Sequence, residues 1–391
     1  MLQSMAWMIL VGLVLAGLFQ RIKLPGLMGM MIAGMILGPY GFDLLSDKIL
    51  LISPELRQIA LIVILLRAGL NLDLKDLKQI GRPAFLMSFV PATFEILMII
   101  GIATWIFNIS VLEAALLGSV LAAVSPAVVV PRMIHLKQMN KGQKHKLPQL
   151  IMAAASVDDI FVIVLFTSFI GLLKGQTFDL DILYKLPISL IAGILCGFGF
   201  AYLFTLIFKR IHIRDTIKVL ILFSLSFFLV GFEVEINTLF PFSGLIAVMT
   251  LGMGIQAFYP ILASRLLGKF AKIWVGEELF LFILVGAVVN LNVLTSITGI
   301  GLLVITIALI GRMIGVQLCL IKTPLNLKER LFTSIAFLPK ATVQAAIGSI
   351  ALSQGLAVGE LILSLAVLSI LFSAPLGAIG IDLSTNILLE D

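Results

Sequence analysis

AAASVDDIFVIVLF, residues 153–166, places two adjacent carboxylates, Asp158 and Asp159, inside an apolar run from Leu147 to Leu173. This run is long enough to cross a bilayer as a helix. An aspartate near the bilayer centre costs about 2.5–3.5 kcal/mol on insertion scales, so a chain does not carry two together without compensation. Carboxylates inside a membrane therefore indicate an ion or proton site, and the rest of the chain can be searched for the groups that compensate them.

The composition of the chain is that of a polytopic membrane protein. Of its 391 residues 60% are hydrophobic and 12% are charged, and the mean hydropathy is +1.17. A globular protein of this size carries about 25% charged residues. We assign the formal charge of +6 to loops on the cytoplasmic side of a membrane, and not to nucleic-acid binding. Cys196 and Cys319 have no zinc or redox spacing, so we expect no cofactor.

The predicted fold class is an all-α polytopic membrane protein with about 13 transmembrane helices. The apolar spans are 3–20, 24–41, 55–72, 83–107, 111–134, 147–173, 187–208, 217–233, 238–258, 272–291, 295–320, 331–353 and 359–380. With the N-terminus outside and the C-terminus cytoplasmic, twenty-one Lys and Arg residues fall inside, Lys75 and Lys78 among them, and four fall outside. This split is the orienting charge bias of membrane proteins, so we expect a multi-pass protein of the cell membrane.

We place five ionisable residues in the membrane interior, namely Glu95, Asp158, Asp159, Arg312 and Lys340. Their charges sum to −1 if all are ionised. If the five are neighbours, the cluster favours one added monovalent cation or one proton but does not easily hold both. That is what exchange of a cation against a proton at a shared site requires. The alternative is structural: Glu95–Arg312 and Asp158–Lys340 would be ion pairs that hold helices together, although buried pairs add little net stability.

Two of the spans are interrupted by proline. The fifth, LLGSVLAAVSPAVVVPRM, contains Ser125, Pro126 and Pro131, and the twelfth, SIAFLPKATVQAAIGS, contains Pro339 and Thr342. Proline removes a backbone donor, and carbonyls freed at membrane depth are tolerated only where protein or a water-filled cavity satisfies them. The hydroxyls of Ser125 and Thr342 suit a small hard cation, but they suit a freed backbone group equally well.

The interruptions occupy matching positions in two halves of the chain. Pro126 and Pro339 are 213 residues apart, and Glu95 and Arg312 are 217 apart. The similar offsets indicate that spans one to six and eight to thirteen are repeats. Because one span links them, the second repeat is inverted in the membrane relative to the first. Paired broken helices in inverted repeats mark a transporter binding site, where Lys340 would offset unfavourable helix-dipole ends. The second half has no acid pair, so we expect one site.

The segments SVDDIFVIVLF, AAVSPAVVVP, GRMIG and FLPKATVQAAIG resemble the monovalent cation:proton antiporter superfamily. The similarity is to its paired-aspartate branch and to the sodium–hydrogen antiporters of solute carrier family nine, subfamily B. It implies Asp159 as the ion-binding carboxylate. Several relatives carry a lysine where this chain has Arg312. The animal subfamily has arginine there and also carries the counterparts of Glu95 and Lys340.

The same resemblance implies a single transmembrane unit over residues 1–391 and a homodimer. Core ion-transport helices would lie in 83–173 and 295–380 and move like an elevator. Scaffold and dimerisation helices would lie in 1–80 and 217–291, with 187–208 as a linker helix.

We hypothesise that the protein exchanges Na⁺ or Li⁺ for H⁺, with Asp158 and Asp159 as ligands of the cation. Arginine stays protonated at any working pH, so Arg312 does not supply the proton and Asp159 does. The exchange would then be one for one and electroneutral. A potassium/proton antiporter and an organic-substrate symporter on the same fold stay open as alternatives. An intramembrane aspartyl protease needs carboxylates on different helices, so we do not expect an enzyme. A channel is disfavoured because no carbonyl filter loop is present.

Overall fold

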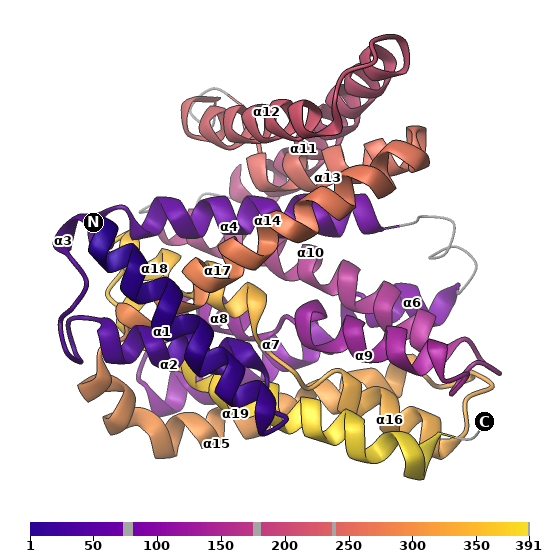
Figure 1. Cartoon of the computed structure of the whole chain (residues 1–391). Coiled ribbons are helices and arrows are strands. Elements are labelled where there is room, and N and C mark those ends of the chain that lie inside the picture. Colours follow the sequence, from indigo (N-terminus) through magenta and orange to yellow (C-terminus); the bar gives the residue numbers. More distant parts are fainter. Residues whose placement is uncertain (73–80, 175–180, 237–239, 390–391) are drawn as a thin grey trace. The chain divides into compact units, whose positions relative to one another are not determined.

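The computed structural model describes residues 1–72, 81–174, 181–236 and 240–389, and all regular secondary structure in them is helical (Figure 1). Lys75 and Lys78 lie outside the described residues. The chain forms two compact units. The first comprises Met1–Arg57, Asp76–Leu173 and Glu278–Asp391, and the second comprises Gln58–Lys75 and Lys174–Glu277. The functional division into core and scaffold stays a prediction.

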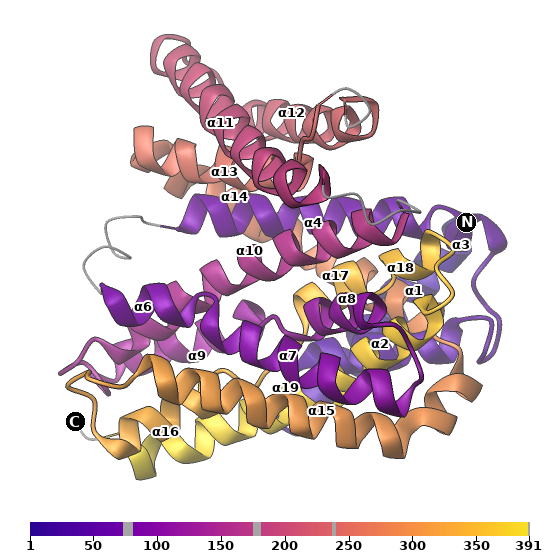
Figure 2. The same cartoon turned by 180° about the vertical axis from the view of Figure 1, so that it is seen from behind.

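The first unit holds both broken helices and the paired aspartates. Its helices are α1 (Leu2–Arg21), α2 (Gly26–Leu37), α3 (Asp47–Leu51), α6 (Arg82–Met87), α7 (Val90–Ile106), α8 (Val111–Leu121), α9 (Pro126–Gln138), α10 (Leu147–Lys174), α15 (Leu291–Cys319), α16 (Leu327–Ala336), α17 (Thr342–Gly348), α18 (Ile350–Ser353) and α19 (Gly359–Leu388). Within this unit α7 and α15 pack along each other (Figure 2).

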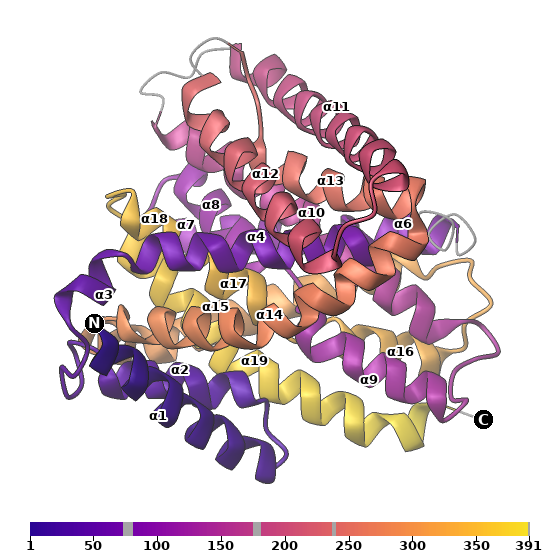
Figure 3. The same ribbon diagram turned by 45° about the horizontal axis from the view of Figure 1, so that its top comes forward.

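The second unit contains α11 (Asp181–Arg210), α12 (Asp215–Ile236) and α13 (Gly244–Phe258), with most of α4 (Ser53–Asn71) and of α14 (Pro260–Ala287). Helix α13 packs against both α11 and α12 (Figure 3). Small residues allow the contact with α11, because a Cβ on Gly197 would lie 2.4 Å from the carbonyl oxygen of Ala247.

Each of the thirteen predicted spans overlaps one or more helices among the described residues, and the twelfth overlaps three, α16, α17 and α18. Eight of these segments are long and apolar enough to cross a membrane, and three further apolar helices are shorter. The start predicted for the tenth span, residue 272, is wrong because α14 begins at Pro260. Proline is well tolerated in a first helical turn. Leu262, Leu266 and Phe270 are fully buried at helical spacing, which extends the packed face into the predicted loop.

The two predicted interruptions are real breaks in the helices. Helix α8 ends at Leu121 and α9 starts at Pro126, whose missing N–H costs nothing at a helix start. The second break separates α16 from α17, and Pro339 lies within it. Pro131 differs from the prediction because α9 continues through it, so the first break precedes Pro126.

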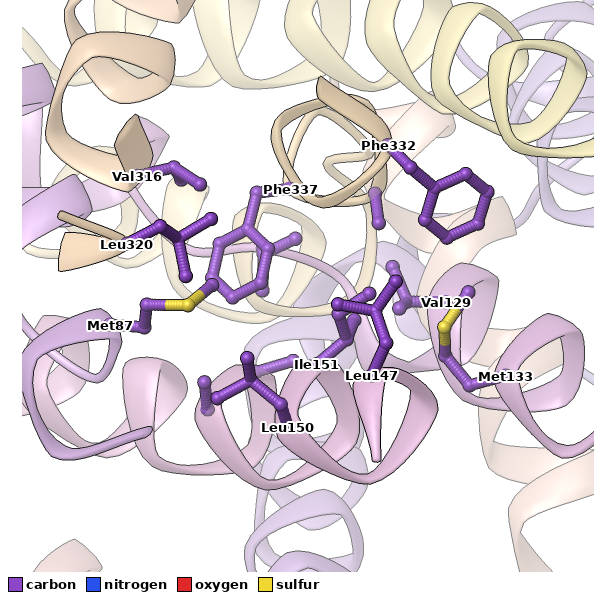
Figure 4. Packing of buried hydrophobic residues seen from close by; sticks show 14 of the residues in the cluster. Met87, Val129, Met133, Leu147, Leu150, Ile151, Val316, Leu320, Phe332 and Phe337 are labelled. Atoms are coloured by element: carbon purple, nitrogen blue, oxygen red, sulfur yellow. The ribbon is translucent and has the colours of Figure 1, made fainter. Parts of the chain in front are cut away.

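A hydrophobic cluster fixes the elements around the first break and the start of α10 (Figure 4). Val129 of α9 and Ile151 of α10 meet Phe337 in the second break and Leu320, which follows α15. Inside a membrane such contacts stabilise the structure through van der Waals packing, because lipid is as apolar as these side chains. The ends of the broken helices are therefore held by packing close to the aspartates on α10.

Glycines bring α15 close enough to α7 for their charged groups to meet. A Cβ on Gly315 would lie 2.7 Å from the Cα of Pro91, and one on Gly311 would lie 2.5 Å from the Cγ of Met98. Any larger residue would force the two helices apart. Arg312 lies between these two glycines, so the close approach places its side chain against α7.

Candidate functional site

Arg312 is the centre of a buried charge cluster in the first unit. Its side chain is fully buried. Nη1 donates to Glu95 Oε2 at 2.9 Å and to the carbonyl of Ala122, while Nη2 donates to Asp158 Oδ2 at 2.7 Å. Nε donates to the carbonyl of Phe337 at 2.8 Å. One guanidinium therefore joins α7, α10 and both helix breaks, which uses the planar fork of donors that only arginine offers.

Lys340 completes the cluster from the second break. Its Nζ lies 2.6 Å from Glu95 Oε2, and both side chains are 1% exposed. Its backbone N–H donates to Ser373 Oγ on α19 at 3.1 Å. The structural alternative paired Lys340 with Asp158, but the contact that forms is with Glu95. Glu95 thus accepts charge-assisted hydrogen bonds from two cations.

The two aspartates differ in their surroundings although they are adjacent on α10. Asp158 Oδ2 accepts from Arg312 and, at 2.9 Å, from the backbone N–H of Val124 in the first break. Asp158 Oδ1 and both oxygens of Asp159 are buried and have no hydrogen-bond partner among the described residues. Three carboxylate oxygens are thus left to accept a proton or bind a cation.

The two breaks touch each other beside these aspartates. The N–H of Ser125 donates to the carbonyl of Pro339 at 2.8 Å, and Ser125 Oγ lies 3.5 Å from Thr342 Oγ1. Ser125 and Thr342 are 217 positions apart, as are Glu95 and Arg312. Two residue pairs with the same sequence offset are therefore in contact. Such contacts are expected near the axis of a two-fold relation between the two halves of the chain. The predicted inverted repeat therefore has a geometric counterpart.

All five predicted ionisable residues are buried, at 3% exposure or less. Glu95, Asp158, Arg312 and Lys340 are joined by direct contacts, and Asp159 follows Asp158 in the chain. The formal sum remains −1, in an environment where an uncompensated charge is costly. The oxygens at the cluster that are able to serve as cation ligands belong to carboxylates and hydroxyls, which are the ligands of hard cations. The cation would be transported substrate and not a resident cofactor.

Sequence reasoning missed three groups that position the cluster. These are the amide of Gln344, the hydroxyl of Ser373 and the backbone N–H of Val124. Gln344 gives a signal that could have been used, because an amide side chain inside an apolar span is expected to find a partner. Ser373 gives little signal, since serines occur in many spans, and a backbone N–H gives none.

Two broken helices that meet at buried ionisable groups define this protein as a secondary transporter of the inverted-repeat class. A family model described as "Sodium/hydrogen exchanger, transmembrane" matches residues 8–383, and the chain belongs to this family.

Relatives agree with this assignment. Human sodium/hydrogen exchanger 9B2 is 34% identical over 92% of this chain and 69% of its own length. Human sodium/hydrogen exchanger 9B1 is 31% identical over 91% of this chain and 71% of its own length. The resemblance to subfamily B that the motifs indicate is thereby confirmed. The fold is similar to that of the sodium proton antiporter MjNhaP1 from Methanocaldococcus jannaschii, with a TM-score of 0.85 at 20% identity over 99% of both chains.

Proposed function

We propose that this multi-pass membrane protein exchanges Na⁺ or Li⁺ for H⁺ at Asp158 and Asp159. One observation carries the proposal. Three buried carboxylate oxygens have no partner among the described residues, in a cluster whose formal charge is −1. A buried site of this kind is stabilised by one positive charge, delivered either by a proton or by a monovalent cation. Competition of the two for the same oxygens makes the protein an exchanger.

The two aspartates take different roles in the proposed cycle. Asp158 is held ionised by the guanidinium of Arg312 and the N–H of Val124. Asp159 has neither contact, so it is the carboxylate that releases its proton when the cation arrives. Arg312 stays protonated throughout. One proton then moves for each cation, and the exchange is electroneutral.

The cation would be bound by oxygens from three elements. Asp159 and the free Oδ1 of Asp158 come from α10, and the hydroxyls of Ser125 and Thr342 come from the two breaks. Both hydroxyls are buried, at 0% and 3% exposure. Carboxylate and hydroxyl oxygens favour a hard cation over a soft one.

We propose an elevator motion of residues 83–173 and 295–380 against a scaffold of 1–80 and 217–291, with 187–208 as the linker. Every ion pair of the cluster joins residues within the first two ranges. Moving these ranges as one body leaves all the buried pairs intact, which avoids exposing uncompensated charges during transport. A homodimer of the scaffold would anchor this motion. The proposed location is the cell membrane, with the N-terminus outside and the C-terminus in the cytoplasm.

The test is exchange in proteoliposomes that contain a pH-sensitive dye. A proton gradient is imposed, and Na⁺, Li⁺ or K⁺ is then added. Asp159→Asn removes the proposed exchanging group, and Asp382→Asn is the matched control. Asp382 is an acid on α19 that contacts Arg132 at 2.9 Å and is 55% exposed, so its loss changes the same charge away from the cluster.

We expect a Na⁺- or Li⁺-driven pH change in the wild type and in Asp382→Asn, and none in Asp159→Asn. A response to K⁺ alone would change the substrate and favour the potassium/proton alternative. A membrane voltage generated by exchange would refute the one-for-one stoichiometry. No response to any of the three cations in folded protein would refute the proposal in favour of an organic-substrate symporter.

A further inference from the structure

The peptide group between Ala123 and Val124, in the first break, is hydrogen-bonded at both of its edges. Its N–H, from Val124, donates to Asp158 Oδ2 at 2.9 Å. Its carbonyl oxygen, from Ala123, accepts from Gln344 Nε2 at 2.7 Å. A single peptide plane therefore connects the amide of Gln344 on α17 to the carboxylate of Asp158 on α10. Hydrogen bonds linked in this way polarise and strengthen one another.

The orientation of the Gln344 amide is fixed by its neighbours. The side chain is fully buried, and Nε2 also lies 3.3 Å from the carbonyl oxygen of Leu121. A flipped amide would set its own oxygen against these two acceptors, so the nitrogen has to face them. Gln344 Oε1 is buried without a hydrogen-bond partner among the described residues. An unpartnered acceptor is costly, so the gain at the nitrogen has to offset that cost.

The free backbone at the first break is held on successive residues. The carbonyl of Ala122 accepts from Arg312, and the carbonyl of Ala123 accepts from Gln344. On the following residues the N–H of Val124 and that of Ser125 donate to Asp158 and Pro339. Arg312 also binds Asp158 directly, whereas Gln344 reaches it only through the peptide plane. Gln344 therefore acts on Asp158 by orientation and not by charge.

We propose that Gln344 is a positioning residue for the ion site, an inference that rests on the proposed cation exchange. By holding the Ala123–Val124 peptide plane, Gln344 keeps Asp158 Oδ2 bound to Val124 and leaves Oδ1 facing the cation. Without the amide the plane loses the hydrogen bond at its carbonyl end, which weakens the hold of the Val124 N–H on the Asp158 carboxylate. The cation then meets a less ordered ligand and binds more weakly, while the translocating helices keep their packing.

The competing explanation is that Gln344 only satisfies carbonyls freed by the helix break. Gln317 provides a matched comparison for that role. It lies on α15 in the same unit, and its Nε2 donates to the carbonyl of Arg330 at 3.1 Å and to Ser334 Oγ at 2.8 Å. Gln317 therefore joins two helices through its amide, and neither of these hydrogen bonds involves a residue of the charge cluster. If Gln344 had only this structural role, replacing Gln344 or Gln317 would change thermal stability and exchange kinetics to a similar extent.

The experiment compares Gln344→Met, Gln344→Asn and Gln317→Met in proteoliposomes over a series of Na⁺ and Li⁺ concentrations. Methionine keeps the length of the side chain without a donor. Asparagine keeps the amide but is shorter by one carbon–carbon bond, about 1.5 Å, so it does not reach Ala123. Asparagine also retains a polar group, so the Gln344→Asn variant still tests the inference if Gln344→Met does not fold. Thermal unfolding in detergent establishes that each variant is folded.

We expect KM for Na⁺ to rise about three- to tenfold in both Gln344 variants, because one hydrogen bond is lost. The maximal rate should stay within about twofold of the wild type, and Gln317→Met should leave KM unchanged. Unchanged KM in both Gln344 variants, or an equal fall in rate for every variant, would overturn the inference while the proposed exchange stands. Absence of exchange in the wild type and in Gln317→Met would refute the proposed function itself and the inference with it.

Discussion

The contacts of Glu95 in the buried charge cluster lead to a specific prediction for removal of its charge. Glu95 Oε2 accepts from Arg312 at 2.9 Å and from Lys340 at 2.6 Å, and its side chain is 1% exposed. Glu95→Gln keeps the shape but leaves Lys340 as a buried cation without its counter-charge. Removing one partner of a buried pair costs about 3–5 kcal/mol. Two charge-assisted hydrogen bonds at about 1.5–3 kcal/mol each give a similar figure.

The same change alters the charge available to a transported cation. With Glu95→Gln and both aspartates ionised, the formal sum of the cluster becomes zero, so an added cation leaves one buried positive charge uncompensated. Na⁺ exchange should therefore be lost. Adding Lys340→Met removes both partners of the Glu95–Lys340 pair and restores the sum to −1. Replacing both partners with groups of similar size is far less costly than removing one. The double variant should regain stability and at least part of the exchange activity.

Thermal unfolding and proteoliposome exchange of the two single variants and the double variant provide the assay. The expected order of stability places the double variant above Glu95→Gln. Equal stability and activity of Glu95→Gln and the double variant would refute the argument, because it would show that the charge sum does not govern the cluster. Wild-type exchange by Glu95→Gln would refute it as well.

Two further predictions concern helix packing and the guanidinium fork. Arg312→Lys keeps the charge but loses hydrogen bonds to several acceptors, so it should destabilise the protein by about 1.5–3 kcal/mol and abolish exchange; wild-type activity would show that charge alone suffices. Gly34→Ala places a Cβ 2.0 Å from the carbonyl oxygen of Ile283, and it should cost about 1–3 kcal/mol in thermal unfolding. Gly17→Ala, with nothing within 4 Å of the new Cβ, should be neutral or stabilising by about 0.5–1 kcal/mol. Equal effects of the two alanines would contradict the close packing of α2 on α14.

The spans and the breaks could be predicted because their signals are local. An apolar run long enough to cross a bilayer, and a proline inside such a run, impose the same constraint wherever the helix lies. The prolines of the fifth span did not all mark the position of the helix break. Pro126 starts α9, whereas Pro131 lies within the same helix. A proline indicates disturbed hydrogen bonding, but the packing of the neighbouring helices decides whether the helix ends there. The start of α14 was missed because its basic residues resemble a loop while its buried face continues the helix.

The membership of the charge cluster and its Glu95–Arg312 pair were predictable, but the partners of Asp158 and Lys340 were not. Burying a charge in a membrane is so costly that Glu95, Asp158, Asp159, Arg312 and Lys340 stand out from their apolar neighbours in the sequence alone. Compensation requires that opposite charges meet somewhere inside the protein. It does not dictate which anion meets which cation, since several pairings satisfy the same sum.

The amino-acid sequence by itself determined the membrane class, the two interrupted helices and the residues that carry charge into the interior, because each follows from the cost of placing that residue in an apolar medium. Only the tertiary structure decided that Arg312 joins Glu95 to Asp158, that Lys340 turns to Glu95, and that Gln344 reaches Asp158 through one peptide plane. Apart from the Val124–Asp158 hydrogen bond, these contacts join residues more than a hundred positions apart in the chain. Their distances are set by how the helices pack, and no local pattern of residues encodes them.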